Sequence, residues 1–308
     1  MATTAGGHRR RPRRPCRETA SGPPLRLGPI RNMTAQHQNA ELFRSLHDAA
    51  APLALANAWD AASARLVEAA GARAVATTSA GVAWGLGAAD GNHLDRDQAV
   101  ALIGRVVAAV SVPVTADIES GFGATPAEVA DTVARVVAAG AVGINIEDAR
   151  TDGGTGLRPT AEQAERIAAA RRAADGAGIP LYINARVDTY LRAVGTEETR
   201  LKETLERAEA YLAAGATGIF VPGVTDPAVV AALTAGIDAP VNILAGPGAP
   251  SVAELSELGV ARVSLGSSVA EAAYAVVRKV AAELTATGTY GGLADALSYG
   301  ELNSLMKG

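Results

Sequence analysis

Eight short apolar runs recur between residues 52 and 267, and each is followed by a loop and an Ala-rich amphipathic segment. The runs are "PLALAN" (52–57), "RAVATTS" (73–79), "VPVTADI" (112–118), "VGINIED" (142–148), "PLYINAR" (180–186), "TGIFVPG" (217–223), "PVNILAG" (240–246) and "ARVSLGS" (261–267). They are continuous rather than alternating, which is typical of parallel strands buried on both faces. Eight such units predict an α/β protein with a (β/α)8 TIM barrel. The alternative is a doubly wound open sheet, but no GxGxxG sequence follows the first run.

The segments between the runs carry the start and stop signals of helices. Residues 125–140 begin with Thr125 as N-cap, Pro126 at the first helical position and Glu128 to complete a capping box, and they end at Gly140. Asp60 and Asp226 begin two further segments in the same way. Residues 288–308 lie beyond the eighth unit and predict an additional helix that caps the barrel or packs on a partner subunit.

Composition excludes several classes of protein. The single cysteine, Cys16, rules out disulfides within the chain and a thiol nucleophile in the folded part, and it is consistent with the cytoplasm. Residues 1–32 hold eight Arg and one acid, a charge of +7, so the rest must carry −11 to give the net −4. An acidic folded part argues against a nucleic-acid surface. No apolar run reaches the roughly 18 residues of a membrane span.

These observations divide the chain into three parts. We predict a disordered Arg- and Pro-rich extension at 1–38, a catalytic barrel at 39–287 and a C-terminal helical segment at 288–308. The extension is either idle, with Met33 as the real start, or an Arg-rich targeting peptide.

Polar residues gather at the carboxyl ends of the predicted strands, where active sites of such barrels lie. The third strand is predicted to end in Asp117 and Glu119, the fourth in Glu147 and Asp148 and the fifth in Arg186 and Asp188, while the opposite ends carry Pro, Ala and Gly. Strand alternation places Glu119 on the same side as Asp117. The second run leads into a Gly-rich loop with Asp90 and His93, and "SAG" (79–81) offers backbone N–H groups for an anion.

Several acids that meet one Arg, without His or Cys, favour a hard divalent cation. Mg²⁺ takes oxygen ligands, keeps several waters and uses one or two carboxylates directly, so the other acids can hold its waters. The plain alternatives stay open: Asp148 and Asp188 pair with a nearby Arg, and Arg186 either pairs with Glu147 or grips a substrate carboxylate.

Four motifs together resemble the isocitrate lyase / phosphoenolpyruvate mutase superfamily: "NAWDAASARLVEAAGARAVATTSAG", "ADIESGFG", "GINIEDA" and "INARVDTYL". The resemblance runs from about Leu42 to Met306. It implies a TIM barrel whose C-terminal helix is swapped onto a neighbouring subunit in a homotetrameric dimer of dimers. It also implies Mg²⁺, with Mn²⁺ as the alternative, and a small carboxylate or phosphonate substrate.

The resemblance further implies roles for single residues. Asp117 would be the direct Mg²⁺ ligand, while Asp90, Glu119 and Glu147 would hold the metal's waters. Arg186 would clamp the substrate carboxylate. Ser79, Ala80 and Gly81 would supply backbone N–H groups to a carboxylate or phosphonate, and Asn242 would be a further substrate contact. Catalysis would thus involve Asp90, Glu147 and Arg186.

Two departures from the family bear on the reaction. The lyase branch has a Lys-Lys-Cys-Gly-His loop where this chain reads "EDARTDGGTGLRPT" (147–160), and the phosphonate branch usually has a His near the sixth strand, which reads "FVPG" here. We therefore expect a Mg²⁺-dependent lyase or decarboxylase that forms an enolpyruvate-like intermediate by C–C cleavage of a 2-oxo or 2-hydroxy diacid. The alternatives are phosphonomutase or phosphonopyruvate hydrolase-type P–C chemistry, and a degenerate barrel with a binding role. The general acid or base stays open among Asp90, Asp148, Asp188 and His93.

Overall fold

The computed structural model describes residue 1, residues 33–150 and residues 156–307, and all that follows concerns the compact unit Arg31–Gly308. Nine parallel strands form its sheet, in the order β1-β9-β8-β7-β6-β5-β4-β3-β2. Their bounds are β1 Leu53–Leu55, β2 Asn57–Ala58, β3 Val75–Thr77, β4 Val114–Asp117, β5 Gly143–Glu147, β6 Tyr182–Arg186, β7 Gly218–Val221, β8 Val241–Leu244 and β9 Arg262–Ser264.

The nine strands make an eight-unit barrel because β1 and β2 are two pieces of one strand, interrupted at Ala56. β1 pairs with β9 and β2 pairs with β3. Asn57 joins the two edges: its Oδ1 accepts the backbone N–H groups of Leu265 (3.2 Å) and Gly266 (3.0 Å), and its Nδ2 donates to the carbonyl of Thr77 (3.0 Å). The predicted TIM barrel is confirmed, with a strand in each of the eight predicted runs.

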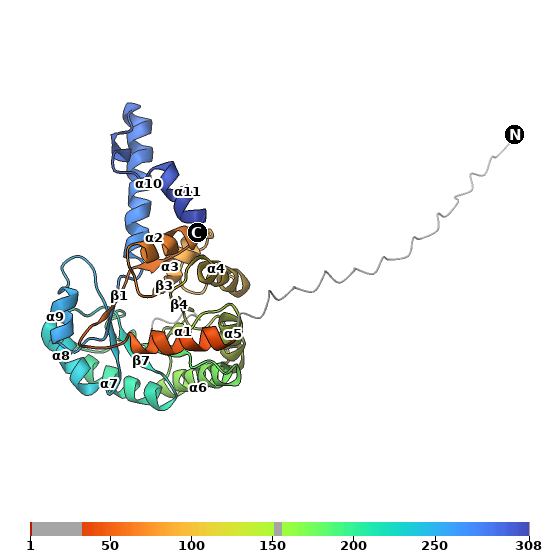
Figure 1. Cartoon of the computed structure of the whole chain (residues 1–308). Helices are drawn as coiled ribbons and strands as arrows, with labels where there is room; N and C mark the ends of the chain where they lie inside the picture. The colour runs from red at the N-terminus through yellow and green to blue at the C-terminus, as the bar shows by residue number, and fades with distance from the viewer. Residues whose placement is uncertain (2–32, 151–155, 308) are drawn as a thin grey trace. The chain divides into compact units, whose positions relative to one another are not determined.

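Helices surround this sheet (Figure 1). Those between strands are α2 Ala61–Ala69, α3 Ser79–Gly85, α4 Arg96–Ala109, α5 Pro126–Ala138, α6 Thr160–Gly176, α7 Glu197–Ala213, α8 Pro227–Gly236 and α9 Val252–Glu257. The predicted caps are present, since Thr125 and Glu128 form a capping box and Asp60 and Asp226 accept N–H groups of the first turns of α2 and α8. Such a cap stabilises a helix by about 1 kcal/mol.

Helix α1, Met33–Ser45, covers the amino ends of the strands through its contact with β6. Phe43 packs edge-on against Tyr182 at the start of β6, and His47 stacks on the same ring at 3.8 Å. Gly143 makes room, because a Cβ there would meet the Phe43 ring. The expected boundary at residue 38 falls inside α1, and the Arg-rich residues 2–32 lie outside the described residues.

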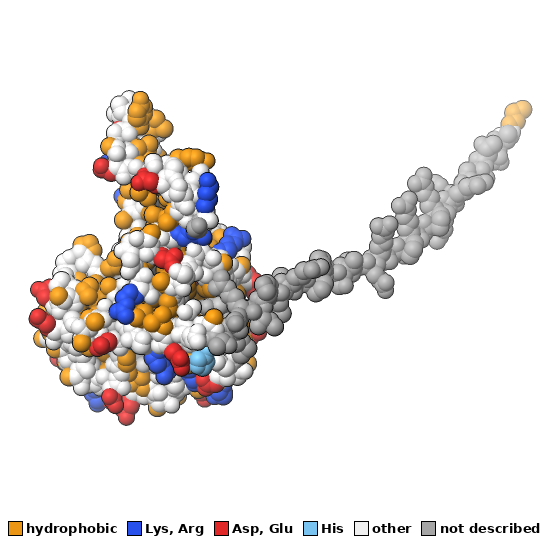
Figure 2. Space-filling model, viewed as in Figure 1, with side chains coloured by type: hydrophobic (Ala, Val, Ile, Leu, Met, Phe, Trp, Pro, Cys, Tyr) orange, Lys and Arg blue, Asp and Glu red, His pale blue; other side chains and the backbone are white. Residues whose placement is uncertain are grey.

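Three helical segments follow the last strand: α10 Ser268–Thr287, η1 Gly291–Leu293 and α11 Tyr299–Lys307. α11 packs on α2, where Arg65 Nη1 donates to the carbonyl of Leu305. Apolar side chains gather on this part of the surface, as Figure 2 shows. The exposed ones are Tyr274, Val276, Val277, Leu284, Tyr290, Leu293, Leu297, Tyr299 and Met306. Among the described helices, none combines the length and the apolar character that crossing a membrane requires.

Candidate active site

The carboxyl ends of β4, β5 and β6 bring three charged side chains to one rim of the barrel. Asp117, Glu147 and Arg186 are the last residues of these strands. Glu147 lies opposite Arg186 in the parallel register, and Asp117 lies opposite Asn145, two residues before Glu147. The three predicted residues therefore share one end of the barrel, as the sequence indicates.

Arg186 is held between two carboxylates. Its Nη1 lies 2.7 Å from Oε2 of Glu147, while Nε and Nη2 donate to the two oxygens of Asp188 at 2.6 and 2.9 Å. Although burial opposes its charge, Glu147 and Asp188 hold the pKa of Arg186 above its ordinary value. Burial raises the pKa of Glu147 despite this partner. A guanidinium has five N–H donors, so two remain for a substrate after these three contacts.

Asp117 is anchored by short bonds to its neighbours. Its N–H donates to Oγ1 of Thr77 (2.9 Å), its Oδ1 accepts the N–H of Glu119 (3.0 Å), and the Ser79 side chain also bonds the carboxylate. Burial raises its pKa, and the charge of Arg186 only partly opposes this. A buried carboxylate of this kind gains from a nearby cation.

Glu119 differs from the expectation that it continues the strand alternation of Asp117. The strand ends at Asp117, and Glu119 adopts a left-handed backbone with φ of 51°. This turn directs its carboxylate to the loop after α3, where it accepts the N–H of Asn92. Ser120 donates to Oδ1 of Asn92 at 3.0 Å. Burial and the charges of nearby acids raise the pKa of Glu119 to about 7, against the pull of the Asn92 N–H.

The same loop carries Asp90 and His93, and both are exposed. The charge of Asp90 contributes to raising the pKa values of Asp117 and Glu119, so Asp90 lies within electrostatic range of both carboxylates. Asp90 is therefore near enough to the rim to act there, whereas the structure gives His93 no such contact.

Ser79, Ala80 and Gly81 form the first turn of α3, directly after β3. Thr78 precedes them in an extended conformation, and its side chain makes no capping bond. Gly81 packs tightly, because a Cβ there would meet Thr78, Trp59 and Ala270 at 2.8–3.2 Å. Thr78 thus leaves the N–H groups of this turn uncapped, and the predicted anion contact stays a prediction.

Asn242 lies deeper than expected for a substrate contact. It is buried in the barrel interior, where its Oδ1 accepts a bond from Ser264 Oγ at 3.2 Å. Among the described residues, its Nδ2 has no hydrogen-bond partner. Its predicted role stays a prediction.

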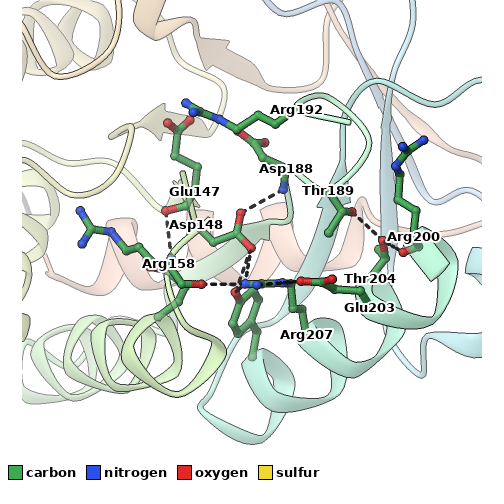
Figure 3. Close-up of polar contacts among 12 residues, drawn as sticks. Glu147, Asp148, Arg158, Asp188, Thr189, Arg192, Arg200, Glu203, Thr204 and Arg207 are labelled. Carbon is green, nitrogen blue, oxygen red and sulfur yellow. Dashed lines mark hydrogen bonds and ion pairs between the residues drawn. The ribbon is translucent and has the colours of Figure 1, made fainter. Parts of the chain in front are cut away.

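Asp148 is part of a buried network that connects β5 to α7 (Figure 3). Its Oδ2 accepts from the Tyr211 hydroxyl (2.9 Å) and from Nη1 of Arg207 (3.2 Å), and its Oδ1 accepts the N–H of Asp188 (3.0 Å). Burial raises the pKa of Asp148 to about 6, with the Asp188 N–H and Arg207 opposing. Asp148 and Asp188 both serve as ion-pair partners of arginines here, which is the plain alternative that the sequence left open.

A divalent cation fits this donor set. No group of three or more acidic, His or Cys side chains lies ready to surround a metal among the described residues. Mg²⁺ needs fewer direct protein ligands than that, because water fills most of its positions. Asp117 is buried with a raised pKa, and Glu119 and Glu147 are neighbouring acids whose pKa values burial also raises. One arginine does not balance these charges, so an oxygen-seeking cation suits the rim.

Several supporting residues have no clear signal in the sequence. Arg166 of α6 is buried and donates to the carbonyls of Ser120, Gly123 and Ala124 at 2.6–3.0 Å, which fixes the turn after β4. Arg207 of α7 supports Asp148. Both lie within amphipathic segments in which an Arg ordinarily marks the exposed face. The one sequence signal that could have indicated them is the helical repeat, which places both positions on the buried face of their helices.

Comparison with known proteins gives a family and several relatives. The model of the family "Phosphoenolpyruvate phosphomutase" matches residues 43–285. The 2-methylisocitrate lyase of Escherichia coli K12 is 31% identical over 210 residues, which are 67% of this chain and 69% of the relative. A crystal structure from Burkholderia cenocepacia J2315, assigned provisionally as a phosphonomutase, is 47% identical with a TM-score of 0.76, over 79% of this chain and 99% of the other.

A further solved structure holds ligands. It is phosphonopyruvate hydrolase in complex with oxalate and Mg²⁺, with 26% identity and a TM-score of 0.76 over 87% of this chain and 95% of the other. The relatives with a named activity are therefore enzymes that act by lyase or phosphonate chemistry.

Proposed function

Because the chain belongs to the phosphoenolpyruvate phosphomutase family, we propose that it is a Mg²⁺-dependent lyase or decarboxylase for small 2-oxo or 2-hydroxy dicarboxylic acids. The observation that carries the proposal is the rim of Asp117, Glu147 and Arg186, in which buried acids outnumber the one Arg that faces them. The Mg²⁺ and oxalate bound to a related hydrolase support the choice of cation.

Each group of the rim has a part in this chemistry. Asp117 would bind the cation directly, and Glu119, Glu147 and Asp90 would bind its waters. When bound, the cation would supply Lewis-acid polarisation of the 2-oxo group, an effect of several kcal/mol. The two remaining N–H donors of Arg186 would hold the substrate carboxylate. The N–H groups of Ser79–Gly81 would stabilise negative charge that develops on substrate oxygens.

Decarboxylation of oxaloacetate suits this site because it asks little of further side chains. The sequence between Asp148 and Pro159 has neither Cys nor His, so it lacks the thiol acid of the lyase branch. The carbanion left by loss of CO₂ needs only an electron sink and a proton, which water can supply. Asp90, exposed beside the acid cluster, is the side chain best placed to relay that proton.

The test is Mg²⁺-dependent pyruvate release from oxaloacetate, measured against the rate of free Mg²⁺ alone. We expect chelation to abolish the excess rate and Asp117→Ala to lower it at least about a hundredfold, since the cation loses its direct ligand. Asp97→Ala, which removes an exposed acid from α4, should keep full activity. Equal rates for wild type and Asp117→Ala would contradict the proposal.

A second candidate is P–C bond chemistry, which the similarity to a provisionally assigned phosphonomutase favours. Phosphorus NMR with phosphonopyruvate decides between the two candidates. Conversion of phosphonopyruvate by a protein that releases no pyruvate from oxaloacetate would select P–C bond chemistry. A binding-only barrel would show no Mg²⁺ binding by calorimetry.

We further propose that the apolar surface of α10 and α11 is covered by a second copy of the chain in a homo-oligomer.

A further inference from the structure

Arg186 and Arg192 both lie beside the carboxylate of Asp188, and they differ in how many of their side-chain N–H groups have a hydrogen-bond acceptor. Arg186 chelates both oxygens at 2.6 and 2.9 Å and also contacts Glu147. Arg192 approaches one oxygen with Nε at 3.7 Å, an ion-pair distance rather than a hydrogen bond. Asp188 is fully buried, whereas the side chain of Arg192 is 34% exposed, twice the exposure of Arg186.

The backbone holds Arg192 beside the site. Its N–H donates to the carbonyl of Asp188 (2.9 Å), and the next residue, Ala193, has a left-handed φ of 49°. Arg200 of α7 fixes the far side of this turn by donating to the carbonyls of Val194 and Gly195. The position of Arg192 therefore follows from an ordered turn rather than from a free loop.

The donors of Arg192 exceed its acceptors. Among the described residues its five side-chain N–H groups make no hydrogen bond, and the ion pair from Nε to Asp188 is long at 3.7 Å, so these donors are available to a ligand. Figure 3 shows the side chain extending over Asp188 toward the side on which Glu147 lies. Because Arg186 already chelates Asp188, Arg192 is left with donors that can bind a further anionic group beside this carboxylate.

We infer that Arg192 binds the second anionic group of the substrate, a carboxylate or phosphonate distal to the 2-oxo acid end that Arg186 and the cation hold. This inference rests on the proposed function and assigns a residue to its preference for acids with two anionic groups. The site would select small 2-oxo or 2-hydroxy acids with two anionic ends over monoacids such as pyruvate. An Nη pair on a planar guanidinium suits such a group, since it can bind two oxygens at once.

The test compares ligands with and without the distal group, by calorimetry in the presence of Mg²⁺. Oxalate occupies only the 2-oxo acid end, whereas 3,3-difluorooxaloacetate and phosphonopyruvate add a carboxylate or a phosphonate. We expect Arg192→Gln to weaken binding of the two longer ligands about tenfold to a hundredfold, as for the loss of a charge-assisted hydrogen bond, and to change oxalate affinity less than twofold. Arg192→Lys, which keeps the charge, should restore part of the loss.

Kinetics and a matched variant complete the test. Arg192→Gln should raise the KM of the diacid with little change in kcat, the pattern of lost uniform binding. Arg172→Gln removes the same charge from an exposed position of α6 and should leave the ratio of oxalate to difluorooxaloacetate affinity unchanged. Equal weakening of oxalate and of the longer ligands by Arg192→Gln, or no weakening of either longer ligand, overturns the inference. Absence of oxalate binding by wild type would instead overturn the proposed function, and this inference with it.

Discussion

The hydroxyl of Tyr211 lies 2.9 Å from Oδ2 of Asp148, so a helix on the outside of the barrel holds the residue that follows the rim acid Glu147. Arg207, one turn earlier on the same helix, donates to this oxygen and to the carbonyl of Arg158. Arg158 returns its own N–H to the carbonyl of Asp148 at 2.8 Å. The two ends of the segment between β5 and α6 are thus fastened to each other and to α7.

Replacement of Arg207 should destabilise the folded protein, because the Asp148 carboxylate would stay buried without this positively charged partner. We expect Arg207→Met to lower the free energy of unfolding by about 3–5 kcal/mol and Tyr211→Phe by about 1.5–3 kcal/mol. Glu203→Gln removes the exposed partner of Arg207 and should cost less than about 1 kcal/mol. Urea denaturation measures all three, and similar losses for Arg207→Met and Glu203→Gln would refute the assignment.

Arg166 should affect both stability and metal binding. Its guanidinium meets three carbonyls of the turn after β4 but no carboxylate, so its loss removes three bonds and also a costly buried charge. We expect Arg166→Met to destabilise by about 2–4 kcal/mol and to weaken Mg²⁺ binding, since this turn carries Glu119.

Arg171 is the matched control for this prediction. It lies on the same helix and donates to the carbonyls of Gly215 and Leu181, away from the rim. Arg171→Met should therefore lower the free energy of unfolding without changing Mg²⁺ affinity, measured by calorimetry. Equal Mg²⁺ affinities for the two variants would show that the turn does not depend on Arg166.

The sequence predicted the barrel and the residues of the rim because both follow from local rules. Because buried parallel strands require continuous apolar runs, each strand could be located from the sequence. The polar residues at the ends of these runs had no structural reason to be there, which marked them as candidates for the site. The network around Asp148 and the turn around Glu119 depend on contacts with α6 and α7, which are distant in sequence. Strand alternation placed Glu119 beside Asp117, whereas the strand ends at Asp117 and Glu119 takes a left-handed turn.

His47 makes stability depend on pH below neutrality. Burial between Phe43 and Tyr182, with the nearby charge of Arg262, lowers its pKa from 6.5 to about 3. The folded protein therefore keeps His47 neutral, while the unfolded chain takes up a proton below pH 6.5, so stability falls as the pH falls from 6.5 toward 3. Between pH 7 and pH 5 this contribution is about 2 kcal/mol.

A variant that cannot titrate isolates this effect. His47→Gln should lose about 2 kcal/mol less than wild type over that interval, from chemical denaturation at both pH values. Other groups titrate equally in the two proteins, so the difference belongs to His47. Parallel pH profiles would mean that His47 is protonated in the folded state.

Gly218 leaves room for the phenol of Tyr182. A Cβ at this position would collide with the Tyr182 hydroxyl and lie 2.9 Å from the carbonyl of Pro240. We expect Gly218→Ala to cost about 1–3 kcal/mol by overpacking. Tyr182→Phe should recover part of that cost in the double variant, because one of the two collisions is removed. Additive losses in a double-mutant cycle would rule out the contact.

The apolar side chains beyond β9 predict self-association. Val277, Leu284, Tyr290 and Tyr299 are each more than half exposed on α10 and the segments after it. Contiguous exposed apolar area of this kind marks an interface. Sedimentation equilibrium should give more than one chain per particle, and Leu284→Glu should shift the protein toward monomers. A monomeric wild type at micromolar concentration would contradict this.

The interruption of the first strand at Ala56 has a consequence for synthesis on the ribosome. The carboxamide of Asn57 bonds to residues 208 and 209 positions later in the chain. Until β9 has emerged, β1 and β8 are edge strands with unpaired N–H and C=O groups, and such edges readily pair with other chains. Contacts of so large a sequence separation also form slowly. The nascent protein is therefore most exposed to misassociation between the emergence of β8 and that of β9 from the ribosome, and chaperone dependence should concentrate in that interval.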